Sequence, residues 1–198
     1  MIKLAFLASN NGSSLRAIVG AIESGALDAQ ALLVVSNRKA ASALGFARDH
    51  GVPVRVIPTA IDPLAADARL ADALAKAGAE WVILSGYLRK LGPRTLAAFA
   101  GRILNIHPAL LPKHGGTGMY GRRVHEAVIA AGDAVTGASV HLVDDEYDHG
   151  EVLARIEVPV DATDTAESVE RRVTAVEPGL FIETLQAIAA GNLAPVRA

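Results

Sequence analysis

The sequence predicts an α/β fold in three layers: a mostly parallel twisted sheet with helices on both faces and an antiparallel C-terminal portion. Three observations predict it. Short apolar runs alternate with amphipathic helical patterns over residues 2–106, which is typical of βαβ units. These runs carry apolar residues on both faces, as in strands covered by helices on both sides. Beyond residue 136, two strand-like runs are separated only by a polar loop, which indicates a hairpin.

The first half of the chain accounts for the parallel part of the sheet. The expected strands are Ile2–Ser9, Ala31–Ser36, Val54–Pro58, Trp81–Ser85 and Arg102–Ile106. The segments between them carry apolar residues at three- and four-residue spacing, as amphipathic helices do. The expected helices are Ser13–Ser24, Ala40–His50, Pro63–Ala77 and Pro93–Phe99.

The C-terminal part is expected to form a hairpin and a long helix. Gly137–Val143 and Val152–Val160 are the two hairpin strands. The helix is expected to begin near Asp164, because Asp164 and Glu167 have the spacing of a capping pair. Pro178-Gly179 is expected to kink or interrupt this helix. The tail GNLAPVRA is expected to be frayed.

Composition indicates a single globular domain spanning residues 1–198. Hydrophobic residues make up 51% and charged residues 20%, so the chain can bury a core and disorder is not expected. The net charge of -2, without a basic stripe, gives no reason to expect nucleic acid or a membrane as a partner. The first apolar run is too short for a secretory signal, and no stretch approaches the ~20 apolar residues of a membrane span.

The chain has no cysteine, which excludes disulfides, thiolate nucleophiles and cysteine-ligated zinc. The lack of cysteine fits a reducing compartment, and we expect a cytoplasmic location. We expect a monomer or a homodimer.

The turn after the first strand is rich in Asn, Gly and Ser. It reads SNNGSSL over Ser9–Leu15 and leads directly into a helix. Free backbone N–H groups, two hydroxyls and the positive end of the helix dipole would make it an anion site. Ser13 or Ser14 could equally well just cap the helix. With one glycine and no following Gly-Lys-Ser/Thr, the turn is neither a dinucleotide fingerprint nor a P-loop.

A second polar group follows the fifth strand. Asn105 and His107 lie two residues apart, so their side chains point to the same face of a strand. Pro108 disfavours helix at His107 and would hold it at the carboxyl edge of the sheet. An amide donates hydrogen bonds without titrating, and a histidine exchanges a proton near neutral pH. Together they form a plausible oxyanion site with a proton-transfer partner.

The hairpin loop could supply a carboxylate to this site. Residues 144–148 read Asp-Asp-Glu-Tyr-Asp, and Gly150 closes the segment. An acid-rich loop is more often a solvated hairpin loop than a functional one. The spacing alone does not select Asp148 among the four acids.

The other histidines have simpler explanations. A metal site could be drawn from the nearby histidines and Asp148, but no HExxH or short His-x-His pairing supports it, so we expect no metal. His141, in an apolar run, is expected to be a hydrogen-bonded core residue. His50, beside Gly51, is expected to end a helix. His125 is expected to lie on a helix, partly exposed.

Several motifs occur in an order that resembles the folate-dependent formyltransferase superfamily. They are SNNGSSL at 9–15, SNR at 36–38, SGYLR at 85–89, NIHPALLP at 105–112, and SVH at 139–141 with Asp148-x-Gly150. The first turn resembles the glycinamide ribonucleotide branch of that superfamily. The resemblance extends from the first strand to about residue 187.

The resemblance implies transfer of the formyl group of 10-formyltetrahydrofolate to the amine of glycinamide ribonucleotide, a step of de novo purine biosynthesis. It implies that Asn105, His107 and Asp148 are catalytic. The amine would attack the formyl carbon directly, Asn105 and His107 would stabilise the tetrahedral oxyanion, and Asp148 would support a protonated His107 and help to relay the amine proton.

The resemblance also implies binding residues for both substrates. Those for the substrate phosphate are Asn11, Gly12, Ser13 and Ser14. Those for the rest of glycinamide ribonucleotide are Pro108 and Glu177. Those for the folate co-substrate are Leu88, Arg89, Lys90, Leu91, Val143 and Asp144, with the rest of the loop to Asp148 closing over the pterin.

Three departures from the family pattern affect these implied contacts. The segment His114–Gly121 is longer than the turn found in many relatives, and its glycines fit a mobile lid or a plain flexible loop. Residues Pro63–Asp67 lack an arginine that some relatives place near the folate tail. Pro178 directly follows Glu177 and would shift its carboxylate.

Three alternatives remain at this point. A formyltransferase acting on a nucleotide-sugar amine or on methionyl initiator tRNA would carry an added C-terminal domain, which 198 residues are not expected to hold. A dinucleotide-binding oxidoreductase would need three glycines in the first turn and an acid after the second strand, where Asn37-Arg38-Lys39 stands. A non-catalytic binding module would not need Asn105, His107 and Asp148 together.

Overall fold

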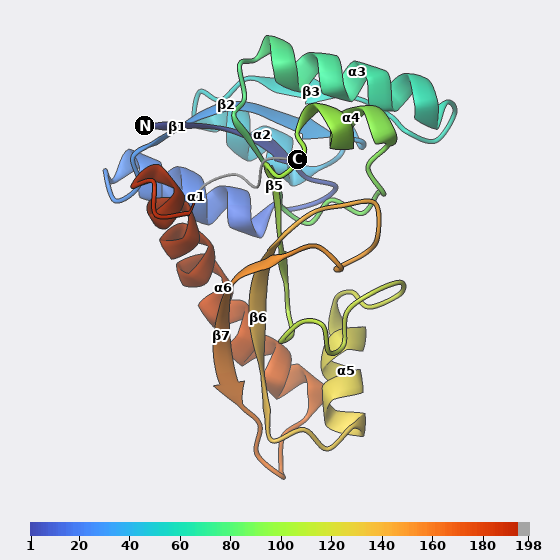
Figure 1. Cartoon of the computed structure of the whole chain (residues 1–198), viewed down its shortest axis with the longest axis vertical. Coiled ribbons are helices and arrows are strands. Elements are labelled where there is room, and N and C mark those ends of the chain that lie inside the picture. Colours follow the sequence, from blue (N-terminus) through green and yellow to red (C-terminus); the bar gives the residue numbers. More distant parts are fainter. Residues whose placement is uncertain (194–198) are drawn as a thin grey trace.

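The computed structural model describes residues 1–193, and its elements follow the predicted order (Figure 1). The strands are β1 (Ile2–Leu7), β2 (Ala29–Ser36), β3 (Val54–Val56), β4 (Trp81–Leu84), β5 (Ile103–His107), β6 (Val135–Leu142) and β7 (Val152–Pro159). The helices are α1 (Ser13–Glu23), α2 (Ser42–Asp49), α3 (Pro63–Lys76), α4 (Pro93–Ala98), α5 (Arg122–Ala130) and α6 (Ala166–Ala189). The expected fraying of the tail concerns mainly residues 194–198, which lie outside the described part.

The strands form a seven-stranded sheet in the order β3-β2-β1-β4-β5-β6-β7. Neighbours from β3 to β5 pair in parallel, whereas β6 pairs antiparallel with both β5 and β7. The predicted mostly parallel sheet with an antiparallel C-terminal portion is therefore confirmed. That residues 1–198 make a single domain stays a prediction.

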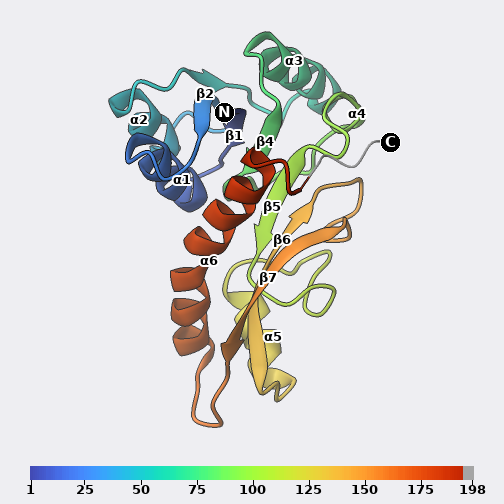
Figure 2. The same ribbon diagram turned by 60° about the vertical axis from the view of Figure 1, so that its left-hand side comes forward.

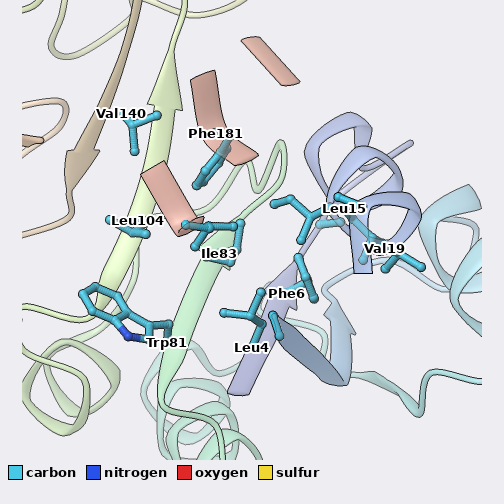
Figure 3. Packing of buried hydrophobic residues seen from close by; sticks show 14 of the residues in the cluster. Leu4, Phe6, Leu15, Val19, Trp81, Ile83, Leu104, Val140 and Phe181 are labelled. Atoms are coloured by element: carbon cyan, nitrogen blue, oxygen red, sulfur yellow. The ribbon is translucent and has the colours of Figure 1, made fainter. Parts of the chain in front are cut away.

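Helices cover both faces of the sheet, which explains why its first strands carry apolar residues on both faces. Helices α1, α2 and α6 pack on one face around a cluster that includes Phe6, Ile83 and Phe181 (Figure 3). Helices α3 and α4 cover the other face, against Leu7 and Val82 among others. Helix α6 runs along β6 and β7 and reaches α1 at its far end (Figure 2).

The predicted cap of α6 is wrong by one residue. Thr165 is the N-cap: its hydroxyl accepts from the backbone N–H of Ser168, and the Ser168 hydroxyl accepts in return from the N–H of Thr165. Asp164 instead accepts from the hydroxyl of Ser168 and pairs with Arg172. The carboxylate of Asp164, one position before the N-cap, thus supports the capping box through the hydroxyl of Ser168.

Of the two effects predicted for Pro178-Gly179, the interruption is wrong, because α6 continues through both residues, and the kink stays a prediction. Pro178 removes one backbone hydrogen bond, which disfavours a helix interior. Burial of Val169 and Val173 before it and of Leu180 and Phe181 after it holds both halves of the helix on the sheet.

Candidate active site

Two polar side chains lie where β5 reaches the carboxyl edge of the sheet. Asn105 and His107 share one face of the strand, as predicted from their spacing. The antiparallel partner β6 places His141 opposite Asn105 and Ser139 opposite His107. His107 is only 3% exposed, so its ring is fixed by protein groups.

The hairpin loop brings Asp148 to the same place. Asp148 Oδ2 lies 3.3 Å from His107 Nδ1 and accepts a hydrogen bond from the backbone N–H of Gly116 at 3.1 Å. Its Oδ1 lies 3.5 Å from His141 Nε2. Asp148 adopts a left-handed backbone conformation, with φ 55°, that turns its side chain to the site. Of the four acids in the loop, Asp148 is the one that faces the two histidine rings.

The surroundings of Asp148 keep it ionised. Burial by itself would raise the pKa of this carboxyl, but His107 and the hydrogen bond from the Gly116 N–H outweigh burial and hold the pKa well below its ordinary value. At neutral pH the group is therefore a permanent acceptor beside His107.

His141 orients the amide of Asn105. Its Nδ1 donates to the carbonyl oxygen of Leu142 at 2.8 Å, so Nε2 of the neutral ring accepts. Asn105 Nδ2 lies 3.1 Å from that Nε2 and donates to it. An amide nitrogen carries two hydrogens, so one is left for an oxygen atom in the pocket. The prediction that His141 is a hydrogen-bonded core residue is confirmed by its 2% exposure.

A cavity of about 510 Å³ opens beside these groups. Its size falls in the range of roughly 300–1,000 Å³ that is usual for small-molecule sites. It is lined by Gly86–Leu88, Asn105–Pro108, Gly116–Gly121, Tyr147 and Asp148. The glycine-rich segment thus forms one wall of the cavity, while its mobility stays a prediction.

The turn before α1 leaves the start of the helix open. The N-cap is Gly12, with φ 68°, so the turn itself supplies no side-chain cap. The alternative that Ser13 or Ser14 serves as a cap is therefore wrong. Leu15 N–H donates to Ser85 Oγ at 2.9 Å, and the adjacent Gly86 lines the cavity. The positive end of α1 consequently adjoins the cavity.

The segment after β4 runs along a second, narrower hollow. Leu88, Arg89 and Lys90 are exposed, whereas Leu91 is buried. A hollow of about 90 Å³ lies between this segment and the Asp144–Asp148 loop, with Val143 in its lining. This hollow is smaller than the roughly 300 Å³ at which ligand pockets usually begin.

Asp144 is tied within its own loop. Its Oδ1 accepts from the N–H of Glu146 at 2.9 Å, and its Oδ2 lies 2.8 Å from His149 Nδ1. These bonds are local and partly exposed, so they give the loop shape while leaving it able to move.

Glu177 of α6 lies half-buried near His107. Burial raises the pKa of this carboxyl from 4.5 to about 7, against the opposing effect of the His107 charge. Glu177 is thus close to half-protonated at neutral pH, and Pro178 has not turned it out to solvent.

Replacing Glu177 with glutamine is expected to stabilise the fold at high pH. Because the pKa is about 7 in the folded state against 4.5 ordinarily, the unfolded state loses this proton first. The free energy of unfolding therefore falls as pH rises from 4.5 to 7. Glu177→Gln should raise it at pH 8 by on the order of 1–3 kcal/mol and leave it little changed at pH 4.5.

Urea denaturation at pH 4.5 and pH 8 measures this effect. The matched control is Glu183→Gln, which changes an exposed glutamate of the same helix. If Glu177→Gln changed the free energy of unfolding equally at both pH values, the assignment of a raised pKa to Glu177 would be contradicted.

Sequence reasoning misjudged His125. It was predicted to be partly exposed but is 2% exposed on α5, with burial lowering its pKa. Its Nδ1 has no hydrogen-bond partner among the described residues. The signal was available, because His125 stands three residues before the buried Val128 and one after the buried Val124. The predicted helix end at His50 is confirmed.

Within residues 1–193, no group of three or more His, Asp or Glu side chains is arranged to hold a metal ion. In the same range, no helix is long and apolar enough to cross a membrane. The absence of a metal requirement stays a prediction.

Comparison with known proteins agrees with this geometry. The family described as formyl transferase matches residues 2–185. "Phosphoribosylglycinamide formyltransferase, chloroplastic" of Arabidopsis thaliana is 41% identical over 190 residues, which cover 94% of this chain and 65% of that protein. Phosphoribosylglycinamide formyltransferase of Escherichia coli (strain K12) is 34% identical over 194 residues, which cover 97% and 89%. The chain thus spans just under two thirds of the Arabidopsis protein.

The fold is also shared with a solved structure of a similar protein. Glycinamide ribonucleotide transformylase 1 from Symbiobacterium toebii superimposes with a TM-score of 0.89 at 34% identity, over 98% of this chain and 90% of that one. The sheet and site define a three-layer α/β protein with titratable groups at the carboxyl edge of its strands. The chain belongs to the formyl transferase family, so the resemblance stated from its motifs is confirmed.

Proposed function

We propose that this protein transfers the formyl group of 10-formyltetrahydrofolate to the amine of glycinamide ribonucleotide in de novo purine biosynthesis. The convergence of Asn105, His107 and Asp148 on one cavity carries the proposal, because direct acyl transfer to an amine needs an oxyanion donor and a proton carrier at one place. The names of the relatives in Arabidopsis and Escherichia coli support it.

The amine substrate is proposed to lie between the start of α1 and β5. Its phosphate would bind at Asn11, Gly12, Ser13 and Ser14, where backbone N–H groups and the helix dipole favour an anion. From there, a small phosphorylated amine can reach Pro108 and Glu177 beside His107. The half-protonated carboxyl of Glu177 can accept a hydrogen bond from that amine at neutral pH.

The folate is proposed to approach from the other side of the sheet edge. It would lie along Leu88–Leu91, with Val143 and Asp144 closing over its ring system. The formyl group then projects into the cavity that Asn105 and His107 line. No metal takes part in this proposal.

The reaction needs no covalent enzyme intermediate. The neutral amine attacks the formyl carbon, a C–N bond forms, and the carbonyl electron pair moves to oxygen. Asn105 Nδ2 donates to that oxyanion. Because the carbonyl of His114 occupies Nε2 of His107 at 2.8 Å, the N–H left for substrate is at Nδ1. When the intermediate collapses, the bond to the folate nitrogen breaks, and that nitrogen takes up a proton relayed from the amine through water held by His107 and Asp148.

We propose a monomer or a homodimer with one such site per chain. A cytoplasmic location and the lack of nucleic-acid or membrane partners stay predictions.

The test follows release of the deformylated folate by absorbance, with 10-formyltetrahydrofolate and glycinamide ribonucleotide supplied together and singly. Release that depends on the amine is expected. Asp148→Asn should abolish it, since the amide cannot support a protonated His107. The matched control is Asp145→Asn, an exposed acid of the same loop, which should keep wild-type turnover.

Two outcomes would contradict the proposal. Release of formate without any amine would mean that water is the acceptor. No response to either ligand would mean that the chain keeps the family fold without this activity.

A further inference from the structure

Both nitrogens of the His107 ring face groups that only accept hydrogen bonds. Nδ1 faces Asp148, and Nε2 lies 2.8 Å from the backbone carbonyl oxygen of His114. A carbonyl oxygen cannot donate, so Nε2 must carry a hydrogen. The His114 carbonyl thus keeps a hydrogen at Nε2 and fixes how the ring is oriented.

His114 holds that carbonyl in an unusual backbone conformation. Its φ is 55°, in the left-handed region that is disfavoured for a residue with a side chain. The residues after it are glycine-rich and add no stiffness of their own. Something outside the backbone has to hold His114 in place.

The side chain of His114 is anchored to Asp133, in the turn between α5 and β6. His114 Nε2 lies 2.7 Å from Asp133 Oδ2, and the two side chains are 12% and 11% exposed. The other oxygen of Asp133 pairs with Lys113, which is 61% exposed. Hydrogen bonds from both partners lower the pKa of Asp133, so its carboxylate is charged at neutral pH.

We propose that Asp133 is a positioning residue for the reaction. Through the ring of His114, it holds the His114 carbonyl against His107 Nε2 and so keeps Nδ1 of His107 for Asp148 and the substrate. Asp133 touches neither substrate, and its influence travels through one side chain and one backbone carbonyl. This inference rests on the proposed catalytic role of His107, but its first consequence, the hydrogen at Nε2, is measurable without any activity.

Kinetics of three variants test the role. Asp133→Ala is expected to lower kcat by about 10- to 100-fold, as loss of an outer hydrogen-bond partner commonly does, with KM for both substrates unchanged. Asp133→Asn, which can still bond His114, should recover most of the loss. Lys113→Ala, which breaks only the exposed half of the pair, should match the wild type.

A second pair of variants keeps the test informative if Asp133→Ala folds poorly. His114→Gly retains the left-handed backbone and the carbonyl but removes the anchored ring. It should lose the same factor in kcat, and the double variant with Asp133→Ala should lose no more, because both changes break one connection. Fully multiplicative losses would overturn the proposal.

Nitrogen-15 NMR of the histidine rings supplies a readout that a purely structural role would not move. In the wild type, His107 is expected to show a protonated Nε2, and Asp133→Ala should yield a mixture of ring states. Wild-type kcat with an unchanged His107 spectrum in Asp133→Ala would overturn the inference. If the wild type instead fails to transfer formyl groups while the spectrum shifts as expected, the proposed function fails and the positioning role stands.

Discussion

Replacing His107 with alanine is expected to lower kcat for formyl transfer by at least about 10³-fold, because one side chain supplies both an oxyanion donor and a proton carrier. The fold should survive, since Asp148 keeps its bond to Gly116 and its contact with His141. The measurement is kcat under saturating substrates, with circular dichroism of the same preparation. KM should change much less than kcat, because the binding contacts proposed for both substrates lie elsewhere.

A conservative variant separates the two contributions of His107. His107→Gln can still donate a hydrogen bond but cannot exchange a proton. If proton transfer is the larger contribution of His107 to the rate, the kcat of His107→Gln should be close to that of His107→Ala. The matched control is His50→Ala, which removes a partly exposed histidine at the end of α2 that pairs with Glu23. Near-normal turnover of His107→Ala would remove His107 from the mechanism and return the chain to the alternative of a binding module.

The parts of the site that lie on regular elements could be predicted from the sequence. Asn105 and His107 were placed on one face because strand side chains alternate with a period of two, whatever the rest of the fold does. The open turn at Gly12 was located because a strand, a short polar turn and a helix follow one another directly. Such features depend on local geometry that neighbouring residues determine.

The parts that depend on distant contacts could not be predicted from local geometry, and only the family resemblance pointed to Asp148. Asp148 stands among four similar acids, and the features that distinguish it are its φ of 55° and its contacts with Gly116 and His107. His114 gave no signal at all, because its role comes from a backbone carbonyl and from Asp133 in another turn. Continuity of α6 through Pro178 likewise depends on packing against the sheet, which outweighs the local preference.

Gly150 is expected to tolerate no side chain, although its motif gives no physical reason for glycine. A Cβ atom at this position would overlap the backbone carbonyl oxygen of Leu142, across the mouth of the hairpin loop. The backbone cannot yield there, because Leu142 N–H also donates to the carbonyl of Glu151 at 2.8 Å. Gly150→Ala should therefore lower the free energy of unfolding by on the order of 3 kcal/mol, measured by urea denaturation.

The same substitution should also abolish formyl transfer in the molecules that remain folded. Gly150 lies two residues after Asp148, so any backbone shift that relieves the overlap also displaces Asp148. The position of Asp148 Oδ2 is set by its 3.1 Å hydrogen bond from the Gly116 N–H. The matched control is Gly20→Ala on the exposed side of α1, where nothing lies near the added carbon; it should stabilise the protein by about 0.5–1 kcal/mol and leave kcat unchanged. Wild-type stability for Gly150→Ala would show that the loop can give way at this point. Lost stability with normal kcat per folded molecule would show that the loop shifts without displacing Asp148, and the glycine of the Asp-x-Gly motif would then serve the hairpin alone.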